Sequence, residues 1–291
     1  MKTFPDPNAT HTRRNFHVRS LVRAVFGLLA LIPPCLAAPA LSWTNNLLTW
    51  TEPRLPGGSL AIFYLEAFCL PGGHERRWDQ TRVPHTTRLL GTSRKGDVLR
   101  FETQVGAAVV VTHQVRALKD GLEMDFTLSN KGSEPWRIQW FQPACVRVDR
   151  FTGAGQSNYV ERAFVFTERG RTWLSETRRT EAALYRGGQV FLPPWIEAND
   201  ANPRPISADR VTNGIIGCVS GDQRWLLALA SDRTFELFEG VYVCLHSDPW
   251  IGGLQPGEAR RIRQRLYLLP NDPKKLLRRY RRDFSHQPHR W

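Results

Sequence analysis

The chain has 291 residues, with 40 Lys and Arg against 27 Asp and Glu, and a formal net charge of +13. Because 41% of the residues are hydrophobic, including 10 Trp and 15 Phe, the chain can bury a full core, which excludes wholesale disorder. The 20 Pro and 22 Gly are spread along the chain and argue against a coiled coil or a helical bundle.

Residues 1–40 have the features of a cleaved export signal. Arginines precede an apolar run from Ala24 to Leu36, which is shorter than the ~20 residues that a membrane span needs. Ala38-Pro39-Ala40 offers a small-residue cleavage site. The run Thr12-Arg13-Arg14-Asn15-Phe16 resembles the bacterial twin-arginine export motif, and ordinary Sec export is the alternative. We therefore expect a bacterial protein that is exported to the periplasm or the cell exterior.

The basic excess lies at the C-terminal end. Residues 258–291 contain eleven basic and three acidic residues, while the chain between this segment and the leader is nearly neutral. Nucleic-acid-binding proteins usually spread basic residues over a reading surface, so no nucleic acid is expected as a partner. A basic end on an exported protein favours an acidic glycan or a membrane surface as partner, or is simply the solvated face of a helix.

Strand-like alternation of apolar and polar residues recurs along residues 41–291. It is clearest on either side of Asp120-Gly121, which predicts a β-hairpin with one buried and one exposed face. Further strand candidates span 60–68, 98–105, 136–148, 163–166, 214–220, 225–230, 235–245 and 260–268. The pattern predicts an all-β fold, a large antiparallel β-sandwich formed by one domain over 41–291.

One helix is predicted near the C-terminus, over about residues 272–284. Asn271-Asp272-Pro273 supplies an N-cap and a proline in the first turn. Apolar residues then recur at helical spacing from Leu276 to Phe284, and Lys and Arg occupy the opposite face. We expect this amphipathic helix to pack on the sandwich.

Four cysteines follow the leader, and none lies in a CxxC motif. They are Cys69, Cys145, Cys218 and Cys244. An oxidising compartment permits up to two disulfides among them. Their positions in apolar runs suit buried free thiols equally well, so no disulfide is predicted.

No strong catalytic motif is present. The absence of HExxH, GxSxG, Walker and GxGxxG sequences leaves zinc protease, serine hydrolase and nucleotide-binding functions without support. The candidate site residues are therefore ionisable groups in apolar or aromatic surroundings, and neither a metal nor a cofactor is assigned.

Five residues are candidates for acid–base chemistry. Glu66 lies in an apolar run, where a carboxylate is either paired with an arginine or desolvated for proton transfer. His246 is expected to end a strand and, with Asp248 in the following turn, to form an acid–base pair or half of a metal site, with an Asx-turn as the alternative. Tyr159 and Glu161 are expected on one strand face.

Polar residues without periodicity fill 193–210, which predicts an ordered lid or site wall. The candidates for substrate binding are Arg162, Asn199, Asp200, Asn202, Arg204, Trp195 and Trp250. The two tryptophans would stack on sugar rings, or else belong to the core. His113, on the apolar side of its strand, is predicted to be a hydrogen-bonded core histidine.

Two segments resemble a known family. The predicted hairpin ends in Leu128-Ser129-Asn130-Lys131-Gly132-Ser133-Glu134-Pro135-Trp136, and Leu254-Gln255-Pro256-Gly257-Glu258 leads into an Arg-rich final strand. In these segments the chain resembles the galactose-mutarotase-like β-supersandwich superfamily, which includes sugar epimerases, polysaccharide lyases and non-catalytic sandwich domains. The resemblance implies the fold and a carbohydrate ligand. It implies a His acid and a Glu base in the epimerase branch, or a Tyr or His base with an Arg or metal in the lyase branch.

The first hypothesis is therefore an exported carbohydrate-active protein that transfers protons on a sugar or an acidic glycan, as an epimerase or a polysaccharide lyase. In the lyase version, Arg162 or Arg204 would neutralise the carboxylate of the substrate. The alternatives are a non-catalytic glycan-binding or cell-envelope-binding module and a metal-binding periplasmic protein. The oligomeric state is not predicted.

Overall fold

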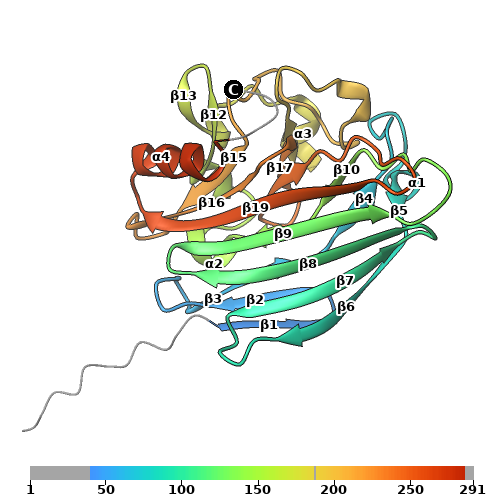
Figure 1. Cartoon of the computed structure of the whole chain (residues 1–291). Coiled ribbons are helices and arrows are strands. Elements are labelled where there is room, and N and C mark those ends of the chain that lie inside the picture. Colours follow the sequence, from blue (N-terminus) through green and yellow to red (C-terminus); the bar gives the residue numbers. More distant parts are fainter. Residues whose placement is uncertain (1–39, 187, 286–291) are drawn as a thin grey trace, which may run out of the picture. The chain divides into compact units, whose positions relative to one another are not determined.

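The computed structural model describes residues 40–186 and 188–285 (Figure 1). The twin-arginine run lies outside these residues, so export and the domain boundary at residue 40 stay predictions. Within the described ranges, no helix is long and apolar enough to cross a membrane.

Two large antiparallel sheets and one small sheet make up most of this region. The nine-stranded sheet contains β6 (His85–Thr92), β7 (Val98–Val105), β8 (Val109–Leu118), β9 (Gly121–Asn130), β12 (Ala163–Thr167), β13 (Gly170–Trp173), β15 (Ile215–Val219), β16 (Trp225–Ser231) and β19 (Ala259–Pro270). Its order is β13-β12-β15-β16-β19-β9-β8-β7-β6, and Figure 1 shows β19, β9, β8, β7 and β6 side by side.

The seven-stranded sheet contains β1 (Ala40–Thr44), β2 (Leu47–Thr51), β3 (Ser59–Phe63), β11 (Cys145–Arg147), β14 (Gln189–Phe191), β17 (Thr234–Gly240) and β18 (Cys244–Pro249). Its order is β1-β2-β3-β11-β18-β17-β14. The small sheet, in the order β10-β4-β5, contains β4 (Ala67–Cys69), β5 (Arg82–Val83) and β10 (Trp140–Gln142). The predicted all-β sandwich is confirmed.

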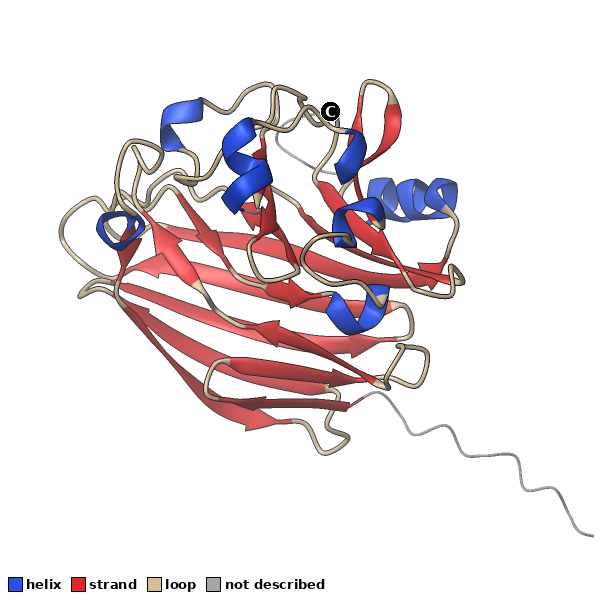
Figure 2. Cartoon of the chain, turned by 180° about the vertical axis from the view of Figure 1, so that it is seen from behind, coloured by secondary structure: helices blue, strands red, loops and turns tan. Residues whose placement is uncertain are grey.

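Helices are short and lie mainly in connections between strands (Figure 2). The α-helices are α1 (Trp78–Thr81), α2 (Asp149–Thr152), α3 (Glu181–Arg186) and α4 (Pro273–Asp283), and the 3-10 helices are η1 (Tyr159–Glu161), η2 (Leu174–Glu176) and η3 (Ala198–Asp200). The predicted C-terminal helix is α4. Its N-cap Asp272 accepts a hydrogen bond from the backbone N–H of Lys275, and Leu276 and Tyr280 pack on the outer face of the nine-stranded sheet.

The main core lies between the two large sheets. Val111 and Phe126, which belong to the predicted hairpin β8–β9, pack in one cluster with Ile62, Val146 and Leu245 of the seven-stranded sheet. None of these side chains is more than 2% exposed. Because side chains alternate along a strand, the neighbours of the last three residues point to the outer face of the seven-stranded sheet.

Three segments that the sequence predicts as single long strands are each interrupted in the structure. The run 60–68 is broken between β3 and β4, so Glu66 lies in a connection and not in a strand. The run 136–148 contains the separate strands β10 and β11. The run 235–245 is a hairpin of β17 and β18, with Val243 at φ 54° in its turn, and His246 therefore lies inside a strand instead of ending one. A continuous apolar run carries no signal for a chain reversal, because buried strands on both sides of a turn have the same composition.

His113 is a core histidine, as predicted. Its Nδ1 lies 2.7 Å from the hydroxyl of Tyr64, and its Nε2 lies 2.9 Å from Oγ1 of Thr103. Its ring stacks on Phe101 and Phe126. Burial lowers the pKa of His113 from 6.5 to about 3. The folded protein therefore holds this imidazole neutral at pH values where the unfolded chain binds a proton.

We expect this histidine to weaken the fold as the pH falls. The unfolded state binds more protons between its pKa of 6.5 and the folded value of about 3, so stability is present above this window and is lost toward acid pH. From about pH 8 to about pH 5 the contribution of His113 falls by about 2 kcal/mol. Urea unfolding of the wild type and His113→Gln at both pH values would measure it. Equal pH dependence in the two proteins would contradict the prediction.

Candidate functional site

A cavity of about 500 Å³ opens above the outer face of the seven-stranded sheet. Its lining residues come from segments far apart in the sequence. They are Glu66, Arg76, Arg77, Trp78, Gln142, Cys145, Asn202, Pro203, Arg204, Phe238, Gly240, Val241, Tyr242, Cys244 and His246.

Strand β18 presents three chemically active side chains to this outer face. Cys244, His246 and Asp248 alternate with apolar or small residues, so all three point to the same side. In the register with β17, Glu236 lies opposite Asp248, and Gly240 lies opposite Cys244. A Cβ atom at Gly240 would overlap the Cys244 sulfur, so glycine is required at this position for the close approach.

His246 is the centre of the polar cluster. Its Nε2 lies 3.9 Å from Oε2 of Glu66, and its Nδ1 lies 3.7 Å from Oδ1 of Asp248. The His246 and Asp248 side chains are buried, at 2% and 0% exposure, whereas the Glu66 side chain is 39% exposed and is the part of the cluster that a molecule in the cavity can reach. The structure therefore brings together the three predicted residues Glu66, His246 and Asp248.

Two neighbouring groups hold Asp248 and Glu236 in place. Nε2 of Gln142 donates to Oδ2 of Asp248 at 2.9 Å, and the backbone N–H of Asn202 donates to Oε2 of Glu236 at 2.9 Å. In the described part of the chain, the second oxygen of each carboxylate and Nδ1 of His246 lack a hydrogen-bond partner. Two fully buried carboxylates thus lie opposite each other, at the next residue pair on the same face of the strands as His246.

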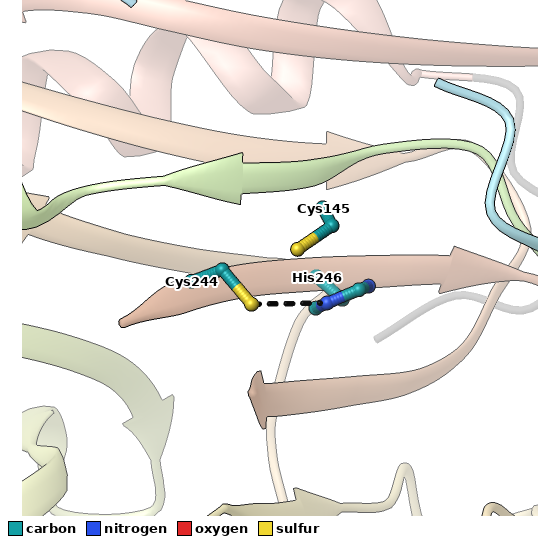
Figure 3. A group of neighbouring side chains, drawn as sticks. All are labelled: Cys145, Cys244 and His246. Carbon is teal, nitrogen blue, oxygen red and sulfur yellow. Dashed lines mark hydrogen bonds between the residues drawn. The ribbon is translucent and has the colours of Figure 1, made fainter. Parts of the chain in front are cut away.

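Two thiols lie beside the same imidazole. Sγ of Cys244 is 3.5 Å from Nε2 of His246, and the ligand atoms of Cys145, Cys244 and His246 all lie within 4.8 Å of one another. Figure 3 shows the two sulfur atoms and the imidazole gathered around one space, with Cys145 on β11 and the other two on β18. All four described cysteines are free thiols.

The cluster changes the proton affinities of its members. A hydrogen bond from Cys145 and the nearby His246 hold the pKa of Cys244 well below its usual value. Burial would lower the pKa of His246, but the charges of Cys244 and Asp248 outweigh it and raise this pKa well above 6.5. Desolvation raises the pKa of Glu66 and, with Asp248 nearby, that of Glu236.

The polar segment 193–210 forms one wall of the cavity through Asn202, Pro203 and Arg204. Asp200 fastens this segment, since its carboxylate accepts from the backbone N–H of Gly72 at 2.7 Å. The carbonyl of Asn199 accepts from the backbone N–H of His74 at 3.1 Å. Asn199 and Asp200 thus tie the wall to the loop that precedes α1, and Arg204 is the charged side chain of this segment that faces the cavity.

The other predicted site residues lie away from this cavity. Tyr159 and Glu161 form the 3-10 helix η1 and not a strand, because the glycine-rich loop before them continues into a turn. Tyr159 is fully buried on the core side and donates its hydroxyl to the carbonyl of Gly240 at 2.8 Å, while Glu161 is exposed. Arg162 donates to the carbonyl of Gly221 at 3.3 Å.

Trp195 and Trp250 are half-buried and pack against the cluster around Trp140 and Phe235, so they do not line the cavity. The aromatic side chains at the cavity are instead Trp78, Phe238 and Tyr242.

A second cavity of about 390 Å³ shares Glu66, Cys145 and Tyr242 with the first. The guanidinium of Arg147 lies 5.9 Å from the ring centre of Phe63 and 5.8 Å from that of Tyr242. Phe63 and Tyr242 are 44% and 67% exposed, so the rim beside Glu66 offers aromatic surface together with positive charge.

Sequence reasoning assigned no site role to the thiols, Glu236, Gln142 or the basic residues before α1. One available signal was the alternation Cys244, His246, Asp248, which places three polar groups on one face of a strand. The contribution of Cys145 had no local signal, because it comes from the neighbouring strand β11.

No family profile and no curated protein matches this sequence. Among solved structures, the chain is similar to an Escherichia coli K12 protein whose assignment as an aldose 1-epimerase is provisional, with 12% identity, a TM-score of 0.40, and coverage of 80% of this chain and 99% of that one. It is also similar to a galactose mutarotase-like protein from Lactobacillus casei, with 10% identity, a TM-score of 0.41, and coverage of 80% and 100%. A third such protein, from Clostridium acetobutylicum, has 9% identity, a TM-score of 0.41, and coverage of 79% and 94%.

Two of these three neighbours carry the name of the family that the sequence resemblance pointed to. Identities of 12% or less with TM-scores below 0.5 transfer neither a residue nor a reaction, so the chemistry must be argued from the site itself.

Proposed function

We propose that the protein is an exported sugar 1-epimerase, which moves protons between the two oxygens of an anomeric carbon with Glu66 as the base. The observation that supports this reaction is the distance of 3.9 Å between Glu66 and His246 at one open cavity. A base and an electrophilic partner this close together can reach the ring oxygen and the hydroxyl oxygen of the same carbon. They cannot act from opposite faces of a sugar ring.

The division of roles follows from exposure. Glu66 reaches the cavity and takes the proton of the anomeric hydroxyl, while the His246 side of the cluster acts on the ring oxygen. Asp248 is buried behind His246 and positions its ring. The lyase alternative loses Tyr159 as its base, because this residue lies on the core side and does not reach the cavity.

The cavity rim suits a sugar that carries negative charge. Three arginines line the cavity: Arg76, Arg77 and Arg204. Their guanidinium groups can pair with a carboxylate of the sugar or donate hydrogen bonds to its hydroxyl groups. Trp78 and Tyr242 supply aromatic surface, on which the C–H face of a sugar ring can lie. We therefore expect uronic acids to be better substrates than the matching neutral aldoses. Export is supported by the leader sequence alone.

The test is the rate of anomer interconversion, followed by polarimetry or NMR exchange over a panel of uronic acids and neutral aldoses. We expect Glu66→Gln to lower kcat by about 10²–10⁴-fold, because general-base catalysis contributes about that factor. Folding should be preserved, since the Glu66 side chain is 39% exposed.

The matched control is Glu168→Gln, an exposed glutamate in the turn between β12 and β13, which should leave the rate unchanged. Sugar binding without turnover by the wild type would instead favour the binding-module alternative. An unchanged rate in Glu66→Gln would remove Glu66 as the base.

A further inference from the structure

We propose that Cys145, Cys244 and His246 bind a thiophilic divalent metal ion of the zinc class, with a fourth coordination position open to the cavity. Two thiolates and one imidazole are a donor set that selects zinc-like ions over magnesium or calcium. Three protein ligands with an open position are typical of catalytic zinc sites, whereas structural sites are closed by a fourth protein ligand.

The sulfur–nitrogen distance fits such an ion. With Zn–S of about 2.3 Å, Zn–N of about 2.0 Å and tetrahedral angles, the sulfur and nitrogen ligands lie about 3.5 Å apart. Cys244 Sγ and His246 Nε2 are 3.5 Å apart, and the Cys145 sulfur completes a triangle with sides within 4.8 Å. The strands hold this triangle in place, because β11 and β18 are hydrogen-bonded neighbours in the sheet.

The residues behind the triangle have the arrangement that metal-binding histidines require. Nδ1 of His246 faces Oδ1 of the buried Asp248 at 3.7 Å, and Gln142 in turn donates to Asp248 at 2.9 Å. A carboxylate behind the ring fixes its orientation and leaves Nε2 directed at the metal. Both the Nδ1 and the Oδ1 atoms lack a hydrogen-bond partner in the described part of the chain, and contraction of this pair would satisfy both.

Glu66 is assigned to the base and not to the ligand set, because its Oε2 lies 3.9 Å from His246 Nε2, farther than the Cys244 sulfur at 3.5 Å, and its side chain is 39% exposed. The open position thus faces Glu66 and the cavity. This inference deepens the proposed function and rests on it for the substrate alone: the ion, held by His246 and the two cysteines, would supply the Lewis acid on the His246 side of the cluster, and Glu66 keeps the role of base.

The experiment is a titration of reduced, metal-free protein with Co²⁺, together with the metal content of the protein as purified. We expect one ion per chain, an intense near-ultraviolet sulfur-to-cobalt charge-transfer band and the strong visible bands of tetrahedral Co²⁺. These spectra report thiolate ligation in the wild type without any substitution. Cys145→Ala and Cys244→Ala should each lose the charge-transfer band or most of its intensity.

Cys218→Ala is the matched control, because Cys218 is also a buried free thiol but lies in β15. It should bind Co²⁺ like the wild type. Asp248→Asn should weaken binding by about 10–100-fold, as expected for a residue that orients a ligand. The proposal is overturned if the wild type shows no sulfur-to-cobalt band, if the band is unchanged in Cys145→Ala and Cys244→Ala, or if Cys145 and Cys244 are joined by a disulfide in the folded protein.

The experiments distinguish failure of the proposed metal site from failure of the proposed epimerase function. Metal binding without sugar turnover would retain the metal site and remove the epimerase function. Full anomer interconversion by the metal-free protein would retain the epimerase function and remove the Lewis-acid role, and the absence of the sulfur-to-cobalt band would remove the site itself.

Discussion

Arg179→Met is expected to destabilise the fold by about 3–5 kcal/mol, because it leaves a carboxylate buried without its partner. Two nitrogens of Arg179 donate to the two oxygens of Glu239 at 2.6 and 2.8 Å. Glu239 is 1% exposed, and the Arg179 side chain is only 13% exposed, so water cannot replace the guanidinium. Desolvation already raises the pKa of Glu239, and Arg179 is the charged group that opposes this shift. Equilibrium unfolding in urea measures the loss.

The neighbouring Arg178 provides the matched control. It pairs with Asp209 at 2.9 Å, but its side chain is 68% exposed, and the buried carboxylate of Asp209 keeps Arg169 and the backbone N–H of residue 178 as partners. Arg178→Met should therefore cost no more than about 1 kcal/mol. The double variant Arg179→Met with Glu239→Gln should recover part of the loss, since the buried charge is then removed. A cost for Arg179→Met no larger than that for Arg178→Met would show that Glu239 is not held as a buried charge.

Gly121→Ala is expected to cost more than about 3 kcal/mol, because the added Cβ has no room. Gly121 opens β9 after the two-residue turn of the β8–β9 hairpin and has φ +142°. A Cβ at this position would overlap the carbonyl oxygen of Leu266 and lie 2.8 Å from its carbonyl carbon, and both atoms belong to the backbone of the adjacent strand β19. The sheet would have to separate at its centre. Urea unfolding measures the cost.

Gly170→Ala isolates the backbone part of this effect. Gly170 opens β13 after a two-residue turn in the same way and has φ +85°, yet a Cβ there would meet nothing within 4 Å. Its substitution should cost about 1–2 kcal/mol from the left-handed backbone alone. Similar costs for both variants would mean that β19 moves away from Gly121 at little expense.

The parts of the fold that the sequence predicts correctly are those with a local period. The alternation around Asp120-Gly121 predicts β8 and β9, and the spacing from Leu276 to Phe284 behind a capping Asp272 predicts α4. The strand prediction fails where apolar and polar residues do not alternate along the sequence. The run that contains β17 and β18 is buried on both sides of its turn, so composition alone does not reveal the reversal at Val243.

The residues of the candidate site were likewise predicted correctly only in part. Glu66, His246 and Asp248 stand out because ionisable groups are rare within apolar segments, and the structure brings all three together. Tyr159 and Glu161 have the same residue types, but they lie in a 3-10 turn with one side chain in the core and the other in solvent. Residue type identifies a group that can transfer protons, whereas only its position decides which cavity it serves.

The sequence by itself determined the sandwich class, the C-terminal helix and the residue types suited to proton transfer, because these depend on periods of two or 3.6 residues and on local composition. The tertiary structure decided that Cys145 lies beside Cys244 and His246, that Glu236 faces Asp248, and that Arg204 reaches the cavity. The physical reason is strand pairing. The order β11-β18-β17 is fixed by the packing of the whole core and leaves no trace in any short stretch of sequence.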